Sequence, residues 1–368
     1  MKRRYDFPYK ELLYSVIGWL FLMYFYYLVS FYGFINSMEK GLVYDYITSW
    51  KPHIELSLSG ILFGLLFGLI NITVERSVLR RKSFGFLVII KSSLYVAALL
   101  IVSAVVDIVF IYFGLISAKT KMELFNFFTN GFFVSFTLFF ITALALSNIF
   151  VQVSKKFGPG NFTKLILGRY HTPKEEEKIF MFLDLKGSTG IAEKLGHTLY
   201  SQFLRNCYHE LTEFIIKYHA HVYQYVGDEV VLCWDVGKGI EDLNCFKLFF
   251  AFREKLRLNK SQYLELFKVI PVFKCGLDMG TVTVSEIGDL KREIAFHGDV
   301  LNTASRIQEQ CNNYHKDMLI SQHLANEIEP TEILSKTFIA KLNLRGKRND
   351  VAIFSIELNN NNIKTLTY

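Results

Sequence analysis

Residues 179–185 read Ile-Phe-Met-Phe-Leu-Asp-Leu, an apolar run of strand length that carries an acidic residue, Asp184, near its end. A short apolar run of this kind predicts a buried β-strand. Apolar residues then recur at helical spacing across residues 188–218, which predicts a long helix after the strand. A strand followed by a helix, with more strands downstream, indicates a sheet covered by helices.

The rest of this soluble half predicts an α/β pattern with an antiparallel component. Residues 221–226 and 229–234 read as two strands joined by a tight turn at Gly227-Asp228. Further along the chain we expect a helix near 240–258, strands near 271–278, 280–287 and 292–297, a helix at 299–313 and short closing elements.

The first half of the chain is different, because four long apolar runs crowd it. Each is long enough to cross about 30 Å of hydrocarbon, which takes about 20 residues of helix. The first run is too long and too aromatic for a signal peptide and lacks a small-residue cleavage site, so we expect it to remain as an anchor. We predict four membrane-spanning helices, near residues 12–34, 54–74, 92–113 and 128–152.

Basic residues predict the orientation of these helices, since short loops rich in Lys and Arg stay on the cytoplasmic side. Four basic residues precede the first run and four follow the second, whereas the other two loops carry two lysines each. We therefore expect a multi-pass protein of the cell's inner (plasma) membrane, in contact with the lipid bilayer. Its N-terminus and its soluble domain would both be cytoplasmic.

Two features inside the apolar runs suggest more than anchoring. Gly60, Gly64 and Gly68 form a smooth helix stripe that lets another helix approach closely, either within the four-helix unit or in a second copy. Asp107 lies in the third run, where an ionisable group is costly. It either snorkels to the nearby outer interface or takes part in sensing a signal.

We divide the chain into a transmembrane domain (1–154), a linker (155–178), a soluble domain (179–358) and a tail (359–368). The linker includes the charge run 174–178, which we expect to be a solvated lead-in to the first strand.

Five cysteines without a CxxC pair argue against a disulfide framework or a zinc site and favour a reducing cytosol. The net charge of +7 lies largely beside the apolar runs, where lipid headgroups explain it, so we expect no nucleic-acid partner.

Two carboxylates carry the first indication of chemistry. Asp184 ends the first strand, and Asp228 stands at the hairpin turn further along the chain. A strand end and an adjacent hairpin tip can converge, and two carboxylates there form a site for a hard cation such as Mg²⁺. Either residue alone would be unremarkable, because Gly-Asp is a common turn sequence.

The chain resembles the class III adenylate/guanylate cyclases, of the bacterial membrane-bound type, over roughly residues 171–357. The resemblance rests on three stretches in order: FLDLKGST at 182–189, YVGDEVVL at 225–232 and HGDVLNTASRIQ at 297–308. It implies an α+β sandwich with a ferredoxin-like core as the catalytic domain.

The resemblance also implies a role for each matching position. Asp184 and Asp228, with the backbone carbonyl of Leu185, would hold two Mg²⁺ ions, with Mn²⁺ as a substitute. Asn302 matches the asparagine that orients the ribose, and Arg306 matches the arginine that stabilises charge on the α-phosphate. A further basic residue, Lys347 in the segment Leu-Arg-Gly-Lys, is the candidate contact to the triphosphate.

The residues that read the base depart from the family pattern. Gln224 and Ala295 stand where many adenylate-forming members have Lys and Asp or Thr. The Gln224 amide can donate and accept, so it fits the edge of adenine or of guanine. His297 is either a nucleotide contact or a buried, satisfied histidine. The choice between ATP and GTP therefore stays open.

In this family the active site forms between two head-to-tail chains, which implies a homodimer with two complete sites and an inactive monomer. The leading interpretation is an enzyme that converts ATP to 3′,5′-cyclic AMP and pyrophosphate, with GTP as the alternative substrate. A second possibility is a catalytically weak, nucleotide-binding regulatory module. A diguanylate cyclase is disfavoured, because its Gly-Gly-acid-Glu-Phe string is absent.

Overall fold

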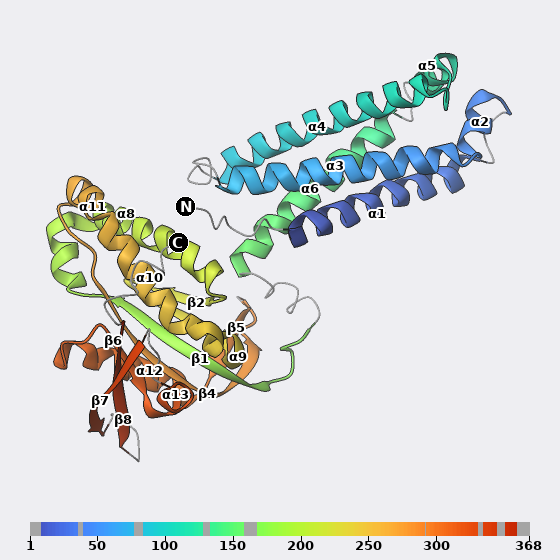
Figure 1. Cartoon of the computed structure of the whole chain (residues 1–368). Coiled ribbons are helices and arrows are strands. Elements are labelled where there is room, and N and C mark those ends of the chain that lie inside the picture. The colour runs from blue at the N-terminus through green and yellow to red at the C-terminus, as the bar shows by residue number, and fades with distance from the viewer. Residues whose placement is uncertain are drawn as a thin grey trace. The chain divides into compact units, whose positions relative to one another are not determined.

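The chain forms two compact units, one N-terminal and one C-terminal, which divide between residues 153 and 154 in the computed structural model (Figure 1). The structure describes the following residues: 9–35, 40–76, 84–127, 133–157, 168–290, 292–329, 334–343 and 350–358.

The N-terminal unit is helical. Its helices are α1 (Tyr9–Phe34), α2 (Leu42–Ile47), α3 (Lys51–Arg76), α4 (Phe84–Tyr112), α5 (Ala118–Phe127) and α6 (Phe133–Phe157). Aromatic rings fill its centre, where Trp19 stacks on Phe140 and meets Phe63 edge-on. Large apolar side chains such as Phe21, Leu100 and Ile108 are exposed on its outside. A helix that is apolar all round is typical of a membrane span.

Three helices are long and apolar enough to cross a membrane, with spans at Glu11–Gly33, Lys51–Val74 and Gly85–Tyr112. The fourth predicted run does form a helix, α6, but the apolar part of its described residues is limited to Leu138–Val151. The described residues therefore establish three candidate spans rather than the four that we predicted.

The glycine stripe of α3 is covered by α1 of the same chain. A Cβ atom added at Gly64 would lie 2.6 Å from Val16 Cα, and one at Gly60 would lie 2.8 Å from Leu20 Cδ2. At Gly68 it would lie 2.6 Å from Leu12 Cδ2. The stripe thus serves packing within the unit, and our alternative of a dimer contact there is wrong because α1 already occupies the surface.

Asp107 has a partner that the sequence did not indicate. Its Oδ1 lies 2.5 Å from Lys121 Nζ of α5, and the same ammonium lies 2.7 Å from Glu55 Oε1 of α3. Tyr46 of α2 donates a hydrogen bond to the other oxygen of Glu55. This cluster ties the two short helices α2 and α5 to the ends of the long ones.

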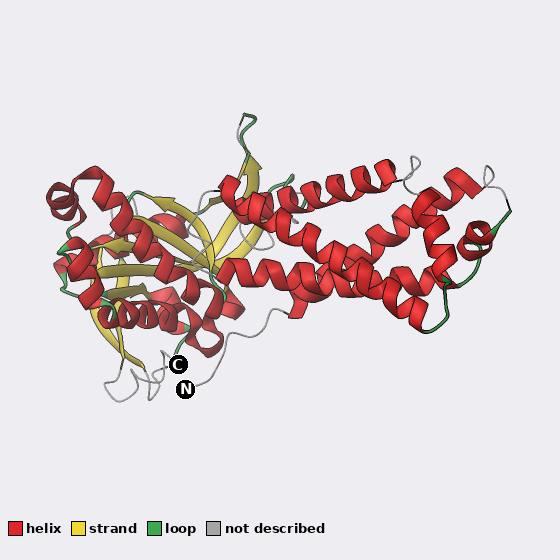
Figure 2. Cartoon of the chain, turned by 90° about the horizontal axis from the view of Figure 1, so that it is seen from above, coloured by secondary structure: helices red, strands yellow, loops and turns green. Residues whose placement is uncertain are grey.

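The C-terminal unit is a mixed sheet of eight strands with helices packed on it (Figure 2). The strand order is β2-β3-β1-β4-β6-β8-β7, and β5 pairs with β4. Among the described strands, β4 and β6 pair in parallel and all the other pairs are antiparallel. The strands are β1 (Lys174–Leu185), β2 (His221–Val226), β3 (Glu229–Asp235), β4 (Phe273–Ile287), β5 (Glu293–His297), β6 (Met318–Ser321), β7 (Leu334–Leu342) and β8 (Val351–Leu358). The helices are α8 (Ser188–Lys217), α9 (Val236–Ile240), α10 (Asn244–Leu258), α11 (Lys260–Phe267), α12 (Asp299–Asn313) and α13 (Gln322–Asn326).

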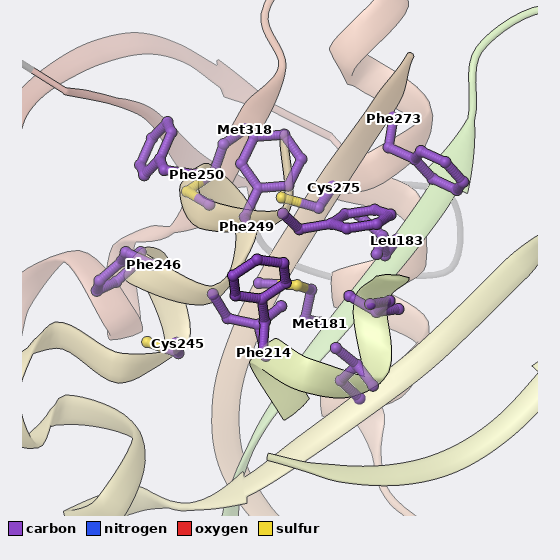
Figure 3. Close-up of a cluster of buried hydrophobic side chains, with 14 of the residues drawn as sticks. Met181, Leu183, Phe214, Cys245, Phe246, Phe249, Phe250, Phe273, Cys275 and Met318 are labelled. Atoms are coloured by element: carbon purple, nitrogen blue, oxygen red, sulfur yellow. The ribbon is translucent and has the colours of Figure 1, made fainter. Parts of the chain in front are cut away.

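Side chains of β1 alternate between the two faces of the sheet. Met181 and Leu183 enter the larger core beneath α8 and α10, together with Phe214, Phe246 and several other aromatic residues (Figure 3). Phe180 faces the other side, where a smaller cluster lies beneath α12. Asp184, at the next-but-one position after Phe182, belongs to this second face.

Three sequence predictions need correction here. The charge run 174–178 is part of β1 and not a lead-in ahead of it, because its backbone pairs with β4 from Lys174 opposite Val284 to Lys178 opposite Gly280. Its side chains are solvated as predicted at Lys174, Glu175 and Glu177, whereas Lys178 is buried. The buried Lys178 ammonium is neutralised by Asp235 and Glu176. The two strands expected at 271–278 and 280–287 are one continuous strand, and α11 was not predicted.

Candidate active site

The strand end and the hairpin tip that carry the two predicted metal ligands lie at the same edge of the sheet. Asp184 of β1 stands opposite Glu229 of β3 and opposite Lys274 of β4. Directly opposed residues of neighbouring antiparallel strands point to the same face, so these three side chains are neighbours. Asp228 precedes Glu229 at the turn, which is possible because Gly227 adopts a φ of 61°. The structure thus brings Asp184 and Asp228 together.

The carboxyl groups at this edge hold protons more tightly than usual. Burial raises the pKa of Asp184, and the charge of Asp228 raises it further, against an opposing effect of Lys274. Burial also raises the pKa of Glu229 to about 7, with added contributions from Asp184 and Asp228. Concentrated, partly buried negative charge of this kind is relieved by a bound cation.

The two carboxylates at this edge suit Mg²⁺, which needs few protein ligands, better than a cation that is bound by protein ligands alone. Within the described ranges, no three acidic, histidine or cysteine side chains lie close enough to hold a metal ion alone. Mg²⁺ commonly takes one or two carboxylates and completes its shell with water and substrate phosphates. The Asp184 and Asp228 pair matches this pattern, while the side chain of Leu185 is buried in the larger core and leaves only its backbone for a ligand.

Two buried residues that the sequence analysis did not identify hold the Asp184 carboxylate. Lys274 Nζ lies 3.3 Å from Asp184 Oδ2, and Gln308 Nε2 donates a 2.9 Å hydrogen bond to the same oxygen. Lys274 is detectable in hindsight, because it is a charged residue within an apolar strand sequence. Gln308 lies inside the quoted motif 297–308, but only the packing of α12 on the sheet reveals its partner.

The two residues expected to act on the ribose and the α-phosphate lie elsewhere on α12. Asn302 is exposed and Arg306, one turn later on the same side of the helix, is half-buried. Among the described residues, no hydrogen bond or ion pair joins either of them to Asp184 or Asp228. The structure therefore does not bring these two predicted groups together within one chain.

The predicted base-reading residues lie on strands that approach each other across β1. Tyr223 of β2 and Phe296 of β5 both contact Phe180 of β1, and their ring centroids are 5.0 Å apart. Gln224, next to Tyr223, is exposed and available to a ligand. Ala295, next to Phe296, is buried opposite Ser285 of β4.

His297 ends β5 and is exposed, opposite Thr283. It is therefore not the buried, satisfied histidine that was the alternative interpretation. Lys347 lies outside the described residues.

A family model described as the adenylate and guanylate cyclase catalytic domain matches residues 171–357. Adenylate cyclase 2 of Rhizobium meliloti (strain 1021) is 28% identical over 219 residues, which cover 59% of this chain and 60% of that protein. An adenylate cyclase of Anabaena cylindrica is 23% identical over 182 residues, covering 48% and 36% respectively. The chain thus spans less than two thirds of the length of these relatives.

A bacterial light-regulated adenylyl cyclase of known structure has a similar fold. Its TM-score is 0.52 at 16% sequence identity, and the match covers 62% of this chain and 67% of that one. At this level of identity the likeness concerns the fold.

Proposed function

Because the chain belongs to the family of adenylate and guanylate cyclase catalytic domains, we propose that it is a membrane-anchored adenylate cyclase. It converts ATP to 3′,5′-cyclic AMP and pyrophosphate for intracellular signalling. The observation that carries the proposal is the pair Asp184 and Asp228, placed side by side by the β1 end and the β2–β3 hairpin. The curated relatives at 28% and 23% identity are both adenylate cyclases, which favours ATP as the substrate.

In the reaction, the ribose 3′-oxygen forms a bond to the α-phosphorus, and the bond from that phosphorus to the pyrophosphate oxygen breaks. The 3′-hydroxyl proton passes to solvent. Asp184 and Asp228, with the Leu185 carbonyl, would hold two Mg²⁺ ions, or Mn²⁺ in their place. When bound, the ions would supply positive charge that favours ionisation of the 3′-hydroxyl and offsets the charge of the triphosphate.

The remaining groups act on the nucleotide. Asn302 orients the ribose, and Arg306 stabilises the negative charge that develops on the α-phosphate. Gln224 contacts the base edge beside Ala295, with His297 close by at the end of β5. Lys347 binds the triphosphate in this proposal.

The two faces of α12 support a site shared by two chains. Residues advance by about 100° along a helix, so Gln308 lies on the side of α12 opposite to Arg306. Gln308 contacts Asp184 of its own chain, whereas Arg306 and Asn302 point away from it. A head-to-tail homodimer then completes two equivalent sites, each with the carboxylates of one chain and the α12 residues of its partner.

The N-terminal unit is a four-helix membrane anchor in this proposal, with α6 as the fourth span beside the three candidates. The basic residues before α1 and after α3 support an orientation in the inner (plasma) membrane with both termini on the cytoplasmic side. The catalytic unit then has access to nucleoside triphosphates.

Guanylate cyclase activity is the second candidate, because Gln224 and Ala295 do not form the usual adenine-reading pair. The deciding experiment incubates the purified full-length protein in detergent with ATP or GTP, plus Mg²⁺ or Mn²⁺, and identifies the product by mass spectrometry. Cyclic AMP as the main product supports the proposal. Cyclic GMP as the main product supports the second candidate. If neither nucleotide gives a cyclic product, both candidates are refuted.

A further inference from the structure

Gln308 joins helix α12 to the carboxylate of Asp184. Its side chain is only 4% exposed, and its Nε2 donates to Asp184 Oδ2 over 2.9 Å. The same oxygen forms a long ion pair with Lys274 Nζ, at 3.3 Å. One carboxylate oxygen is therefore held from two directions, by a neutral amide of the helix and by a cation of the sheet.

These two partners differ in their effect on a bound cation. The amide fixes the direction of the carboxylate without adding charge, so it leaves the affinity of Asp184 for a cation intact. A closer contact with the Lys274 ammonium would neutralise the carboxylate and repel the metal ion. Loss of the Gln308 bond would remove the amide that shares this oxygen with Lys274.

Helix α12 is a rigid support for this bond. Its backbone lies directly on β4 at Gly276, where an added Cβ atom would lie 2.3 Å from Gln308 N and 2.5 Å from Ala304 O. Ile307 and Cys311 on the same side of the helix are fully buried. The position of the Gln308 amide is thus fixed by backbone packing.

We infer that Gln308 is a positioning residue, which holds Asp184 away from Lys274 in the orientation that binds a divalent cation. The inference rests on the proposed function, in which Asp184 is a metal ligand. Because the other side of the helix carries Asn302 and Arg306, Gln308 also connects the metal-binding half of one site with the nucleotide-binding half of the other.

The test measures Mn²⁺ binding directly by electron paramagnetic resonance, on the full-length protein in detergent and without nucleotide. Gln308→Met keeps the length and approximate volume of the side chain but removes the donor. We expect it to raise the Mn²⁺ dissociation constant about tenfold, which corresponds to ~1.4 kcal/mol. The matched control is Gln310→Met on the same helix, whose partner is Asn313 and which should bind Mn²⁺ as the unmodified protein does. If Gln308→Met does not fold, Gln308→Asn tests the same bond with a shorter amide.

The outcomes separate this inference from the proposed function. Mn²⁺ binding by Gln308→Met within twofold of the unmodified protein, with binding lost in Asp184→Asn, would overturn the positioning role and leave the metal assignment in place. Unchanged binding by Asp184→Asn would refute the metal assignment itself.

Mixed dimers add a second readout. A dimer of Asp228→Ala and Arg306→Ala chains retains one intact site. Gln308→Met should raise the metal concentration for half-maximal activity when it is placed in the Arg306→Ala chain, which supplies the intact carboxylates, and have little effect in the Asp228→Ala chain. Equal effects in both chains would contradict a positioning role.

Discussion

The close approach of α12 to β4 predicts that Gly276→Ala is among the most damaging single-methyl additions in the catalytic unit. The new Cβ would lie 2.3 Å from Gln308 N and 2.5 Å from Ala304 O, and both are backbone atoms. They can move away only if the whole helix shifts from the sheet. That shift would weaken the packing of Ile307 and Cys311, which are completely buried.

Overpacking in a core costs about 1–3 kcal/mol, and loosening the helix adds part of the cost of large core truncations, about 2–5 kcal/mol. We therefore expect Gly276→Ala to lower the free energy of unfolding by roughly 2–4 kcal/mol. For a domain of this size, the melting temperature should fall by about 5–15 °C. Cyclase activity should fall as well, because Asn302 and Arg306 move with the helix.

A thiol-reactive fluorophore provides a suitable assay in detergent. All five cysteines belong to the catalytic unit and are buried, so the dye reports the unfolding of this unit and not of the membrane helices. The control is Gly190→Ala in α8, where an added Cβ meets nothing within 4 Å and the melting temperature should stay the same or rise slightly. Equal melting temperatures for Gly276→Ala and the unmodified protein would refute the packing that we describe.

Three further predictions concern the site. Chains carrying Asp228→Ala and Arg306→Ala should each be inactive but regain activity when mixed, and proven mixed dimers without activity would contradict a shared site. Gln224→Ala should lower the ratio of kcat/KM for ATP over GTP by roughly ten- to a hundredfold, because a lost hydrogen bond costs about 1–3 kcal/mol; a constant ratio would place base recognition elsewhere. Since the pKa of Glu229 rises from 4.5 to about 7 on folding, its contribution to stability is complete below pH 4.5 and is lost as the pH rises to about 7. Calorimetry without metal should show a smaller loss of stability over this range for Glu229→Gln, and identical pH profiles would count against the burial of its carboxyl group.

The local elements of the catalytic unit were largely predictable from the sequence. The hairpin 221–234 and the helix at 299–313 agree with β2, β3 and α12, because turn residues and helical spacing mark them locally. The charge run 174–178 misled the prediction, since its pairing with β4 is set by residues a hundred positions away. Whether a charged segment precedes a strand or forms part of it depends on such a partner and not on its own composition.

At the candidate site, too, the sequence analysis missed contacts that depend on residues far apart in the chain. Asp184 and Asp228 stand out because each sits at the end of a recognisable element, and the register of β1 and β3 then brings them together. Lys274 and Gln308 reach Asp184 only through the β1–β4 register and the seating of α12 on Gly276. Neither contact has a sequence pattern of its own.

The two faces of α12 supply the reason why the proposed site needs a second chain. The side of α12 that packs on the sheet is close-fitting and mostly apolar, and its two buried polar side chains both have partners: Thr303 donates to Asp299 O and Gln308 to Asp184. Asn302 and Arg306 therefore have to lie on the opposite side, directed away from the carboxylates of their own chain. A second copy related by a two-fold axis is the simplest arrangement that brings them to such carboxylates, and it does so twice. In the proposed dimer, a substitution on the sheet-facing side of α12 should therefore act mainly at the site whose carboxylates that chain supplies, and a substitution at Asn302 or Arg306 mainly at the other site.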